Sequence, residues 1–361
     1  MGDFYNRKPT FNMKITFVCK YLGKGGAERV MSILINYFVH KGFQVQLILL
    51  YEDLIEYSIP DEVDVIYLGW KSTKFIPDLI ARMKQLREVI TGDCVISFIY
   101  SAIRDTVFSL IGKKNIKVII SDRSDPSREP AGWLRQQIRT VSYYFADTIV
   151  FQTQDAQKFF PKKIQKKSVI IPNPINDALP KPYKGVRKKI ICAAGRLDDQ
   201  KNFRLLIESF ADFYKKHNDF KLYIYGRGPK LIELQELTRE LSVEHVVFFP
   251  GFIKNIAEKM NEATMYISSS DYEGISNTML EAMALGVPTI CTDCPVGGAR
   301  MTIKDGYNGL LVPVGSKKDI TNAMLRVAED PNLAAFLSQN AVNIREELKP
   351  DVICKMWYSL L

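Results

Sequence analysis

Residues 265–290, MYISSSDYEGISNTMLEAMALGVPTI, decide the fold of this chain. The apolar segment Met265–Ser268 predicts a strand, and a polar loop follows it. Ser276 is a suitable N-cap and Gly286 a suitable stop, so we expect a helix between them and a second strand at Val287–Cys291. This order directs free backbone N–H groups and the positive end of a helix dipole at a ligand above the loop. Phosphate suits that geometry best.

Two carboxylates bracket this unit, Glu273 in the loop and Glu281 inside the helix. The helix residues around Glu281 are otherwise apolar, so we expect its carboxylate in largely dry surroundings, where a charge needs a specific hydrogen-bonding partner. A vicinal diol, such as that of a ribose, is one such partner. The alternative is that Glu281 lies half-exposed on the helix and that Glu273 belongs to an ordinary loop.

The size and composition of the chain are those of a two-domain globular protein. It has 361 residues, of which 47% are hydrophobic and 25% charged. No apolar run is long enough to span a membrane, and the N-terminus lacks the apolar centre of a secretory signal. Six cysteines scattered through apolar surroundings favour reduced thiols and a cytoplasmic location. Cys291 and Cys294 have the spacing of a metal or redox pair, but there is no second pair, so we interpret them as structural.

The net charge of +9 resides mainly in the first half of the chain. Residues 1–180 hold 25 Lys and Arg against 18 Asp and Glu, whereas the remainder holds 24 against 22. There is no zinc finger, RNP-like motif or array of basic helices, so we do not expect nucleic acid as a partner. An anionic membrane surface or a phosphorylated lipid fits the excess better. The alternative is a charge that serves only solubility.

Strand-like segments alternate with helical patterns along both halves, which predicts parallel, doubly wound sheets. The expected strands are Lys14–Cys19, Gln44–Leu50, Val63–Leu68, Cys94–Phe98, Lys117–Ile120, Thr148–Phe151, Ser168–Ile171, Lys189–Ala194, Phe220–Tyr225 and Val246–Phe249. Two helical patterns, Lys74–Ile90 and Arg128–Tyr144, mix bulky apolar residues with basic ones. Each fits either a helix that covers the sheet or a basic amphipathic helix on a membrane surface.

A glycine loop joins the first expected strand to the first expected helix. Gly23 and Gly25 have the spacing of a dinucleotide-binding fingerprint, but Glu28 takes the place of the third glycine. Because an acidic group there would repel a pyrophosphate, the dinucleotide interpretation is weak. The alternative is that Glu28 caps its helix.

Several motifs occur in a fixed order along the chain. They are Gly25-Gly26-Ala27-Glu28, Ile171-Pro-Asn-Pro174, Gly195-Arg196-Leu197-Asp198-Asp199-Gln200-Lys201-Asn202, Glu273-x7-Glu281 and Asp305-Gly-Tyr-Asn-Gly309-Leu-Leu-Val-Pro313. In their spacing and order they resemble the signature of retaining glycosyltransferases of family four. The resemblance covers nearly the whole chain.

This resemblance implies an α/β protein with the GT-B fold, in which two Rossmann-like, doubly wound domains face a central cleft. Residues 1–175 are then expected to bind the acceptor, and residues 176–189 to link the domains. Residues 190–345 are expected to bind the nucleotide sugar. Residues 346–361 are expected to form a C-terminal helix that crosses back to the first domain.

The resemblance also implies roles for single residues, and no metal or other cofactor. Glu281 is expected to hold ribose hydroxyls and Glu273 sugar hydroxyls, while Arg196 and Lys201 neutralise the leaving diphosphate. The residues expected to bind the donor are Gly25, Gly26, Gly195, Arg196, Lys201, Gly226, Phe252, Glu273, Gly274, Ile275, Ser276, Asn277 and Glu281.

One further residue is expected in the reaction, and two arginines depart from the family pattern. Arg123 follows a strand at a place where the family often has a histidine near the donor sugar, and a guanidinium there cannot act as a general base. The alternative is a surface arginine paired with Asp122 or Asp125. Arg300 stands where the family commonly has a glutamate.

The implied activity is transfer of a sugar, with retention, from a nucleotide sugar to a glycan or polyprenyl-linked acceptor in surface polysaccharide biosynthesis. UDP-sugar is the default donor, and the enzyme is expected in the cytoplasm or at the inner face of the cell membrane. One alternative is a catalytically silent, sugar-nucleotide-binding partner subunit, although the intact cations and glutamates argue against it. Another is a GT-B epimerase, which would need additional acid–base residues.

Overall fold

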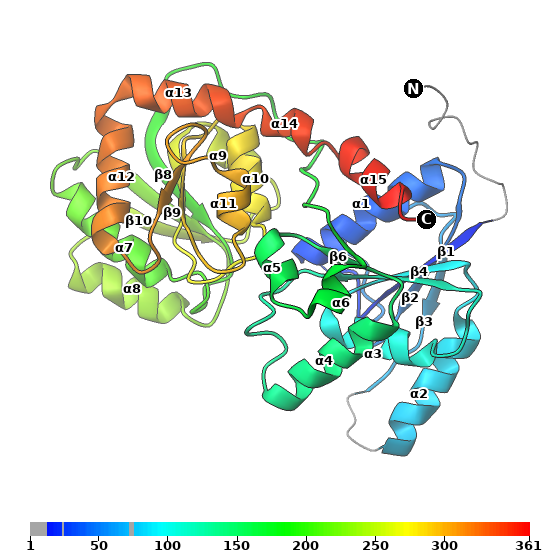
Figure 1. The fold of residues 1–361 in the computed structure, drawn as a ribbon. Helices are drawn as coiled ribbons and strands as arrows, with labels where there is room; N and C mark the ends of the chain where they lie inside the picture. The colour runs from blue at the N-terminus through cyan, green and yellow to red at the C-terminus, as the bar shows by residue number, and fades with distance from the viewer. Residues whose placement is uncertain (1–12, 24, 72–75) are drawn as a thin grey trace. The chain divides into compact units, whose positions relative to one another are not determined.

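The computed structural model describes residues 13–23, 25–71 and 76–361, and the chain divides into two compact units (Figure 1). The first comprises Met1–Pro172 and Asp351–Leu361, and the second comprises Asn173–Pro350. Lys74, the predicted start of a helix, lies outside the described residues. None of the described helices is both long enough and apolar enough to cross a membrane.

A parallel sheet in the order β3-β2-β1-β4-β5-β6-β7 forms the core of the first unit. Its strands are β1 (Lys14–Cys19), β2 (Gln44–Leu49), β3 (Asp64–Tyr67), β4 (Cys94–Phe98), β5 (Lys117–Asp122), β6 (Thr148–Phe151) and β7 (Ser168–Ile170). Helices cover both faces, so the central strands are apolar on both sides (Figure 1). They are α1 (Gly26–His40), α2 (Ile76–Val89), α3 (Tyr100–Ser109), α4 (Trp133–Phe145), α5 (Gln154–Lys158), α6 (Lys162–Gln165) and α15 (Pro350–Tyr358).

The last helix, α15, completes the first unit although it follows the second unit in the chain. Trp357 is fully buried, and its ring centroid lies 5.4 Å from that of Phe98 at the end of β4. Tyr358 packs edge-on against Phe43, with 5.9 Å between the ring centroids. These aromatic contacts hold the C-terminal segment on the first sheet.

The second unit is built on a six-stranded parallel sheet in the order β10-β9-β8-β11-β12-β13. Its strands are β8 (Lys188–Ala194), β9 (Lys221–Tyr225), β10 (Val247–Gly251), β11 (Ala263–Ser268), β12 (Thr289–Thr292) and β13 (Leu310–Val312). Its helices are α7 (Phe203–Tyr214), α8 (Leu231–Glu240), α9 (Ile256–Asn261), α10 (Asn277–Ala284), α11 (Gly298–Thr302), α12 (Lys317–Glu329), α13 (Pro331–Ala341) and α14 (Ile344–Glu347).

The helix predicted after residue 276 is confirmed at both ends. The Ser276 hydroxyl accepts the backbone N–H of Met279 at 3.4 Å, and α10 begins at Asn277. The helix stops before Gly286, which has a φ of +64° in the left-handed region that favours glycine.

The division between the units falls between Pro172 and Asn173, so residues 176–189, predicted to link the domains, are grouped with the second unit. Arg345 binds part of this segment. Its guanidinium donates to the backbone carbonyls of Pro180 and Leu179 at 2.8 and 3.1 Å, and so fixes the segment on the second unit.

Candidate functional site

Two loops of the second unit meet at the carboxyl ends of its central strands, β8 and β11. The first loop, Gly195–Asn202, follows β8, and the second loop, Ser269–Ser276, follows β11. The strand after β8 in the chain pairs on one side of it, whereas β11 pairs on the other. The strand order therefore reverses at β8, and in open α/β sheets ligands bind at such a reversal.

Hydrogen bonds tie the two loops together. The backbone N–H of Asp271 donates to the carbonyl of Gln200 at 2.9 Å, and the Gln200 side chain donates to the carbonyl of Tyr272 at 3.1 Å. The Asn202 amide donates to the Asp271 carboxylate at 2.8 Å. Asp271 therefore joins the two loops through both its backbone and its side chain, a role that its place in the sequence did not reveal.

Lys201 of the first loop and Glu273 of the second form a direct ion pair. Their side chains are only 15% and 20% exposed, so the attraction acts in partly dry surroundings, where it is stronger than in bulk water. Ser270 also donates to the Glu273 carboxylate, at 3.4 Å. The structure thus brings together the cation and the carboxylate that were expected to contact adjacent parts of the donor.

Arg196, the other predicted cation, extends into solvent from the same loop. Its side chain is 70% exposed, and its Nε lies 2.5 Å from the Asp198 carboxylate. The other oxygen of Asp198 accepts the backbone N–H of Lys201 at 3.2 Å. Asp198 therefore orients the loop and Arg196 together, and the guanidinium stays accessible to an anionic ligand.

Glycines allow the backbones around these loops to approach closely. A Cβ on Gly226, after β9, would lie 1.8 Å from the Gly195 carbonyl oxygen, and Gly226 has a φ of +141°. A Cβ on Gly298 would lie 1.8 Å from the carbonyl oxygen of Gly274. No side chain fits at either place. Gly226 was predicted as a site residue from the resemblance, whereas Gly298 was not.

The start of α10 is held by a residue outside the predicted set. Asn173, which is buried, donates from its amide to the carbonyl of Ile275 at 3.2 Å and to the side-chain oxygen of Asn277 at 2.9 Å. It fixes the turn that carries Gly274 and Ser276. Its place in the Ile171–Pro174 motif was the only signal in the sequence, and we had assigned that motif to the end of the first domain.

Glu281 lies inside α10 and is 5% exposed. The prediction of largely dry surroundings is confirmed, and the half-exposed alternative is wrong. Phe252, in contrast, is 50% exposed after β10. Nearby on the same sheet, the rings of Tyr223 and Phe248 stack with 4.9 Å between their centroids.

Three predicted residues lie in the first unit. Gly25 is the N-cap of α1 and Gly26 its first residue, without a side-chain cap. The Glu28 carboxylate folds back over Gly25, where a Cβ would lie 2.0 Å from Oε2, and burial raises the pKa of Glu28. Its carboxylate therefore closes over the glycine turn.

Arg123, the third, is packed among aromatic rings. Its guanidinium lies 4.5 Å from the ring centroid of Phe98 and 5.9 Å from that of Trp357. Its Nε donates to the Ser121 hydroxyl at 3.1 Å, and desolvation lowers the pKa of Arg123 to about 9. The structure therefore packs Arg123 between β5 and α15, with its guanidinium against two aromatic rings.

No group of three or more His, Cys, Asp or Glu side chains in the described ranges is placed to hold a metal ion. Cys291 and Cys294 are both buried free thiols. Burial raises the pKa of Cys294 to about 11, and the nearby Glu273 carboxylate adds to this shift. Both thiols are therefore protonated and inert near neutral pH.

Comparison with known proteins identifies relatives along most of the chain. The family model described as Glycosyl transferases group 1 matches residues 176–343. An uncharacterised glycosyltransferase of Methanocaldococcus jannaschii is 31% identical over 334 residues, which are 80% of this chain and 80% of that protein. The N-acetylgalactosamine-N,N'-diacetylbacillosaminyl-diphospho-undecaprenol 4-alpha-N-acetylgalactosaminyltransferase of Campylobacter jejuni is 29% identical, over 86% of this chain and 89% of that protein.

Solved structures share the whole architecture. Anabaena HepE in complex with UDP and glucose aligns with a TM-score of 0.80 and 18% identity, over 96% of this chain and 99% of that one. The lipopolysaccharide outer core galactosyltransferase WaaB aligns with a TM-score of 0.76 and 20% identity, over 97% and 100%. At this identity the likeness concerns the fold alone, and it confirms the predicted GT-B fold.

Proposed function

The chain belongs to the group 1 glycosyltransferases, and from this premise we propose that it transfers a sugar from a UDP-sugar, with retention, to a glycan or polyprenyl-linked acceptor. As a member of this family it is a transferase, and its relatives support a role in polysaccharide or lipid-linked glycan biosynthesis. What we propose beyond this is the identity of the donor, the stereochemistry of transfer and the class of acceptor.

The Lys201–Glu273 pair carries this proposal, because it unites the two groups that the reaction needs at one point of the sheet. In our proposal Lys201 and the accessible Arg196 neutralise the diphosphate, whose negative charge grows as the glycosidic bond breaks. Glu273 accepts hydrogen bonds from hydroxyls of the transferred sugar. Glu281, buried behind the turn, serves the ribose hydroxyls. The cations take the part that a metal ion plays in other transferases.

Backbone groups complete the proposed donor site. The turn Gly274–Ser276 leads into α10, whose first residue is Asn277, so the N–H groups of this turn and the helix dipole face the region above the loops. Gly195 leaves room for the Lys201 side chain, which a Cβ would meet at 2.7 Å, and Gly226 lets its backbone approach that of Gly195. Gly25 and Gly26 at the start of α1 have the same backbone chemistry, and we assign them to the phosphates and the acceptor.

The proposed reaction uses no protein nucleophile. The departing diphosphate oxygen helps to remove the proton of the attacking acceptor hydroxyl, and the sugar leaves and arrives on one face. The chain's own residues bind and orient the substrates and balance the charge of the diphosphate. In this proposal the Arg123 guanidinium, packed on Phe98 and Trp357, supplies positive charge and does not act as a base.

Two relatives support the choice of substrates. The solved HepE structure contains UDP and glucose, and the name of the Campylobacter jejuni relative describes a diphospho-undecaprenol acceptor. A polyprenyl-linked acceptor resides in a membrane, so we also propose that the enzyme works at the inner face of the cell membrane.

A panel of nucleotide sugars tests the proposal. The purified chain is expected to release UDP slowly from one UDP-sugar without acceptor, and NMR of the hydrolysed or transferred sugar is expected to show the donor's anomeric configuration. Lys201→Ala provides the matched inactive control. Release from GDP- or ADP-sugars alone would contradict the choice of donor, and an inverted product would contradict retention.

A further inference from the structure

Helix α4 exposes its apolar side chains to solvent. We call Trp133, Leu134, Val141, Tyr144 and Phe145 the outward face. Trp133, Leu134 and Phe145 are 74%, 63% and 52% exposed. An amphipathic helix of a globular protein normally buries such a stripe. The stripe here therefore indicates a surface that something else covers.

The inward side of α4 is polar and its contacts fix the orientation of the helix. Arg139 is 1% exposed, donates to the carbonyls of Pro126 and Glu129, and lies 4.8 Å from the ring centroid of Phe160. The Tyr143 hydroxyl donates to the Asp122 carboxylate at 2.8 Å. Turning the helix to bury its apolar stripe would break these buried hydrogen bonds and leave their polar partners unsatisfied in apolar surroundings. The outward face is therefore a fixed feature.

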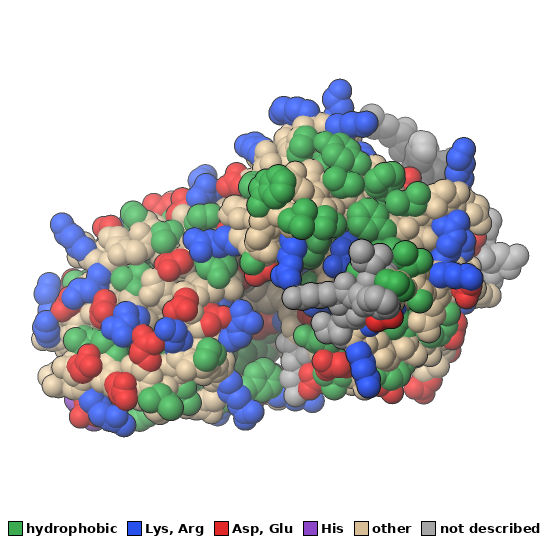
Figure 2. Space-filling view, turned by 90° about the horizontal axis from the view of Figure 1, so that it is seen from below, with side chains coloured by type: hydrophobic (Ala, Val, Ile, Leu, Met, Phe, Trp, Pro, Cys, Tyr) green, Lys and Arg blue, Asp and Glu red, His purple; other side chains and the backbone are tan. Residues whose placement is uncertain are grey.

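A border of lysines accompanies this face. Residues 130–167 contain seven Lys and Arg against two Asp. The lysines of this stretch lie on and beside α5 and α6, and α6 packs against α4. Lys163 lies 5.6 Å from the ring centroid of Tyr144, and Lys167 donates to the Tyr144 carbonyl at 2.9 Å. Figure 2 shows hydrophobic side chains gathered on one face of the molecule with Lys and Arg around them.

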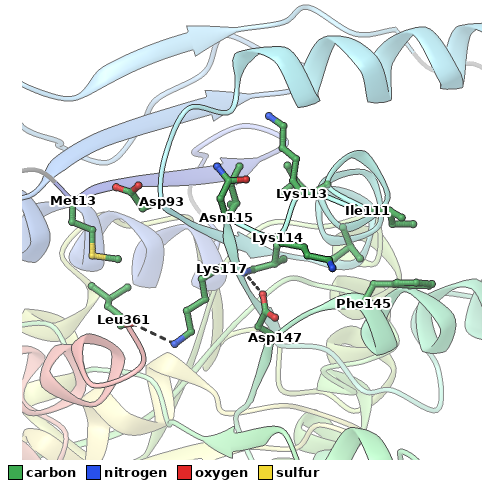
Figure 3. Close-up of a pocket in the computed structure, with 15 residues that line it drawn as sticks. Met13, Asp93, Ile111, Lys113, Lys114, Asn115, Lys117, Phe145, Asp147 and Leu361 are labelled. Atoms are coloured by element: carbon green, nitrogen blue, oxygen red, sulfur yellow. Dashed lines mark hydrogen bonds between the residues drawn. The ribbon is translucent and has the colours of Figure 1, made fainter.

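The far end of α4 opens into a cavity of about 680 Å³ that continues the same chemistry (Figure 3). Phe145 lines it together with apolar residues of α3 and the loop that follows, and Lys113, Lys114 and Lys117 lie around it. The carboxylates of Asp93 and Asp147 in its lining accept backbone N–H groups, at 2.9 and 2.7 Å. Lys113 and Lys117 donate to the carbonyls of Arg87 and Leu361 at 2.7 and 3.4 Å, so the cavity combines apolar walls with both lysines and carboxylates.

We propose that the outward face of α4 and its lysine border dock on a bilayer that contains anionic phospholipids. The aromatic and aliphatic side chains enter the region between headgroups and acyl chains, and the lysines contact the phosphates. The charge of the border selects this occupant, because an apolar stripe alone would fit any apolar partner. The inference deepens the proposed function, which requires access to a lipid-linked acceptor, by naming the surface that provides it.

Vesicle flotation with the full chain tests the proposal. We expect binding to vesicles that contain phosphatidylglycerol but not to vesicles of phosphatidylcholine alone, and we expect it to weaken as salt rises. Each lysine near an anionic surface contributes about 1 kcal/mol, so removal of three charges should lower partitioning about 100-fold. The test variant is Lys162→Gln/Lys163→Gln/Lys166→Gln. Its control, with the same charge loss on the second unit, is Lys216→Gln/Lys259→Gln/Lys318→Gln.

A second pair of variants tests the apolar part. Leu134→Ser/Phe145→Ser removes exposed side chains, so the fold is expected to persist and partitioning to fall about tenfold or more. Val186→Ser/Ile232→Ser removes exposed apolar side chains of the second unit and should leave partitioning unchanged.

Three results would overturn the docking proposal. They are equal binding to neutral vesicles, equal losses in test and control variants, and a dimer in sedimentation velocity that the Leu134→Ser/Phe145→Ser variant abolishes. The last result would identify the outward face as a contact between copies of the chain. UDP release without acceptor needs no membrane, so its absence would count against the proposed function and leave the vesicle result standing.

Discussion

Gly298→Ala perturbs the proposed donor site without adding a charge or removing a hydrogen-bonding group. Gly298 lies at the start of α11, and its backbone touches the second loop at Gly274. A methyl group at this position would lie 1.8 Å from the Gly274 carbonyl oxygen and 3.0 Å from the Cα of Ile275. The atoms it meets are backbone, so no side chain can rotate away.

The size of the effect follows from this geometry. Contacts of a real Cβ essentially never fall below 3.0 Å, so the loop must move by at least the missing 1.2 Å. A misplacement of about 1 Å can cost about 100-fold in rate, or about 2.7 kcal/mol of transition-state stabilisation. We also expect an overpacking cost of about 1–3 kcal/mol in the free energy of unfolding.

The assay measures kcat/KM for UDP release together with urea unfolding of the same sample. Gly315→Ala is the matched control, because Gly315 has a φ of +74° and no atom within 4 Å of a built Cβ. It carries the strain of a left-handed alanine, about 1 kcal/mol, without a contact to either loop. A folded Gly298→Ala protein with kcat/KM within about threefold of wild type would refute the placement of the donor phosphates at this turn.

Four further outcomes are expected. Glu273→Gln should slow transfer by more than about tenfold, a loss of at least about 1.4 kcal/mol, while UDP affinity persists because Lys201 remains; an unchanged rate would remove Glu273 from the site. Lys201→Ala should weaken binding of UDP more than that of uridine in calorimetric titrations, and equal losses would contradict a phosphate role. Asn173→Asp keeps the shape of the side chain but loses its N–H donors, so kcat/KM should fall and the free energy of unfolding should drop by about 1–2 kcal/mol; a change in stability alone would make Asn173 merely structural. Burial raises the pKa of Glu28, so ionisation of its carboxylate lowers the free energy of unfolding once the pH exceeds the ordinary pKa of glutamate. Glu28→Gln should therefore stabilise the protein at neutral pH but not below about pH 4, as measured by thermal unfolding curves. Equal gains in stability at both pH values would contradict this.

The sequence predicted those parts of the fold that depend on local signals. The apolar run Met265–Ser268, the cap at Ser276 and the glycine at Gly286 are each sufficient to define a boundary, and each is confirmed. The dry surroundings of Glu281 followed from its apolar neighbours in the helix. These features are set within a few residues of chain, so no knowledge of tertiary contacts was needed.

The sequence could not predict contacts between residues that are far apart in the chain. Asn173 and Gly298 both hold the second loop, and neither belongs to that loop. Composition likewise cannot reveal that Arg345 binds two carbonyls of the segment 176–189, which was predicted to link the domains. For Arg123 the expectation came from an aligned position, whereas its surroundings depend on Trp357, which arrives from the other end of the chain.

The orientation of α4 shows why periodicity alone is ambiguous. A helical pattern of apolar and basic residues is the same whether its apolar stripe faces the sheet or the solvent. The choice is made by Arg139 and Tyr143, whose buried bonds to the loop after β5 and to Asp122 at the end of β5 require a polar inner side. Such bonds are costly to break, so the hydrophobic effect cannot turn the helix inward. The exposed stripe is therefore a consequence of the polar contacts beneath it, and the same residues that shape the loop after β5 also determine which surface of the first unit is apolar.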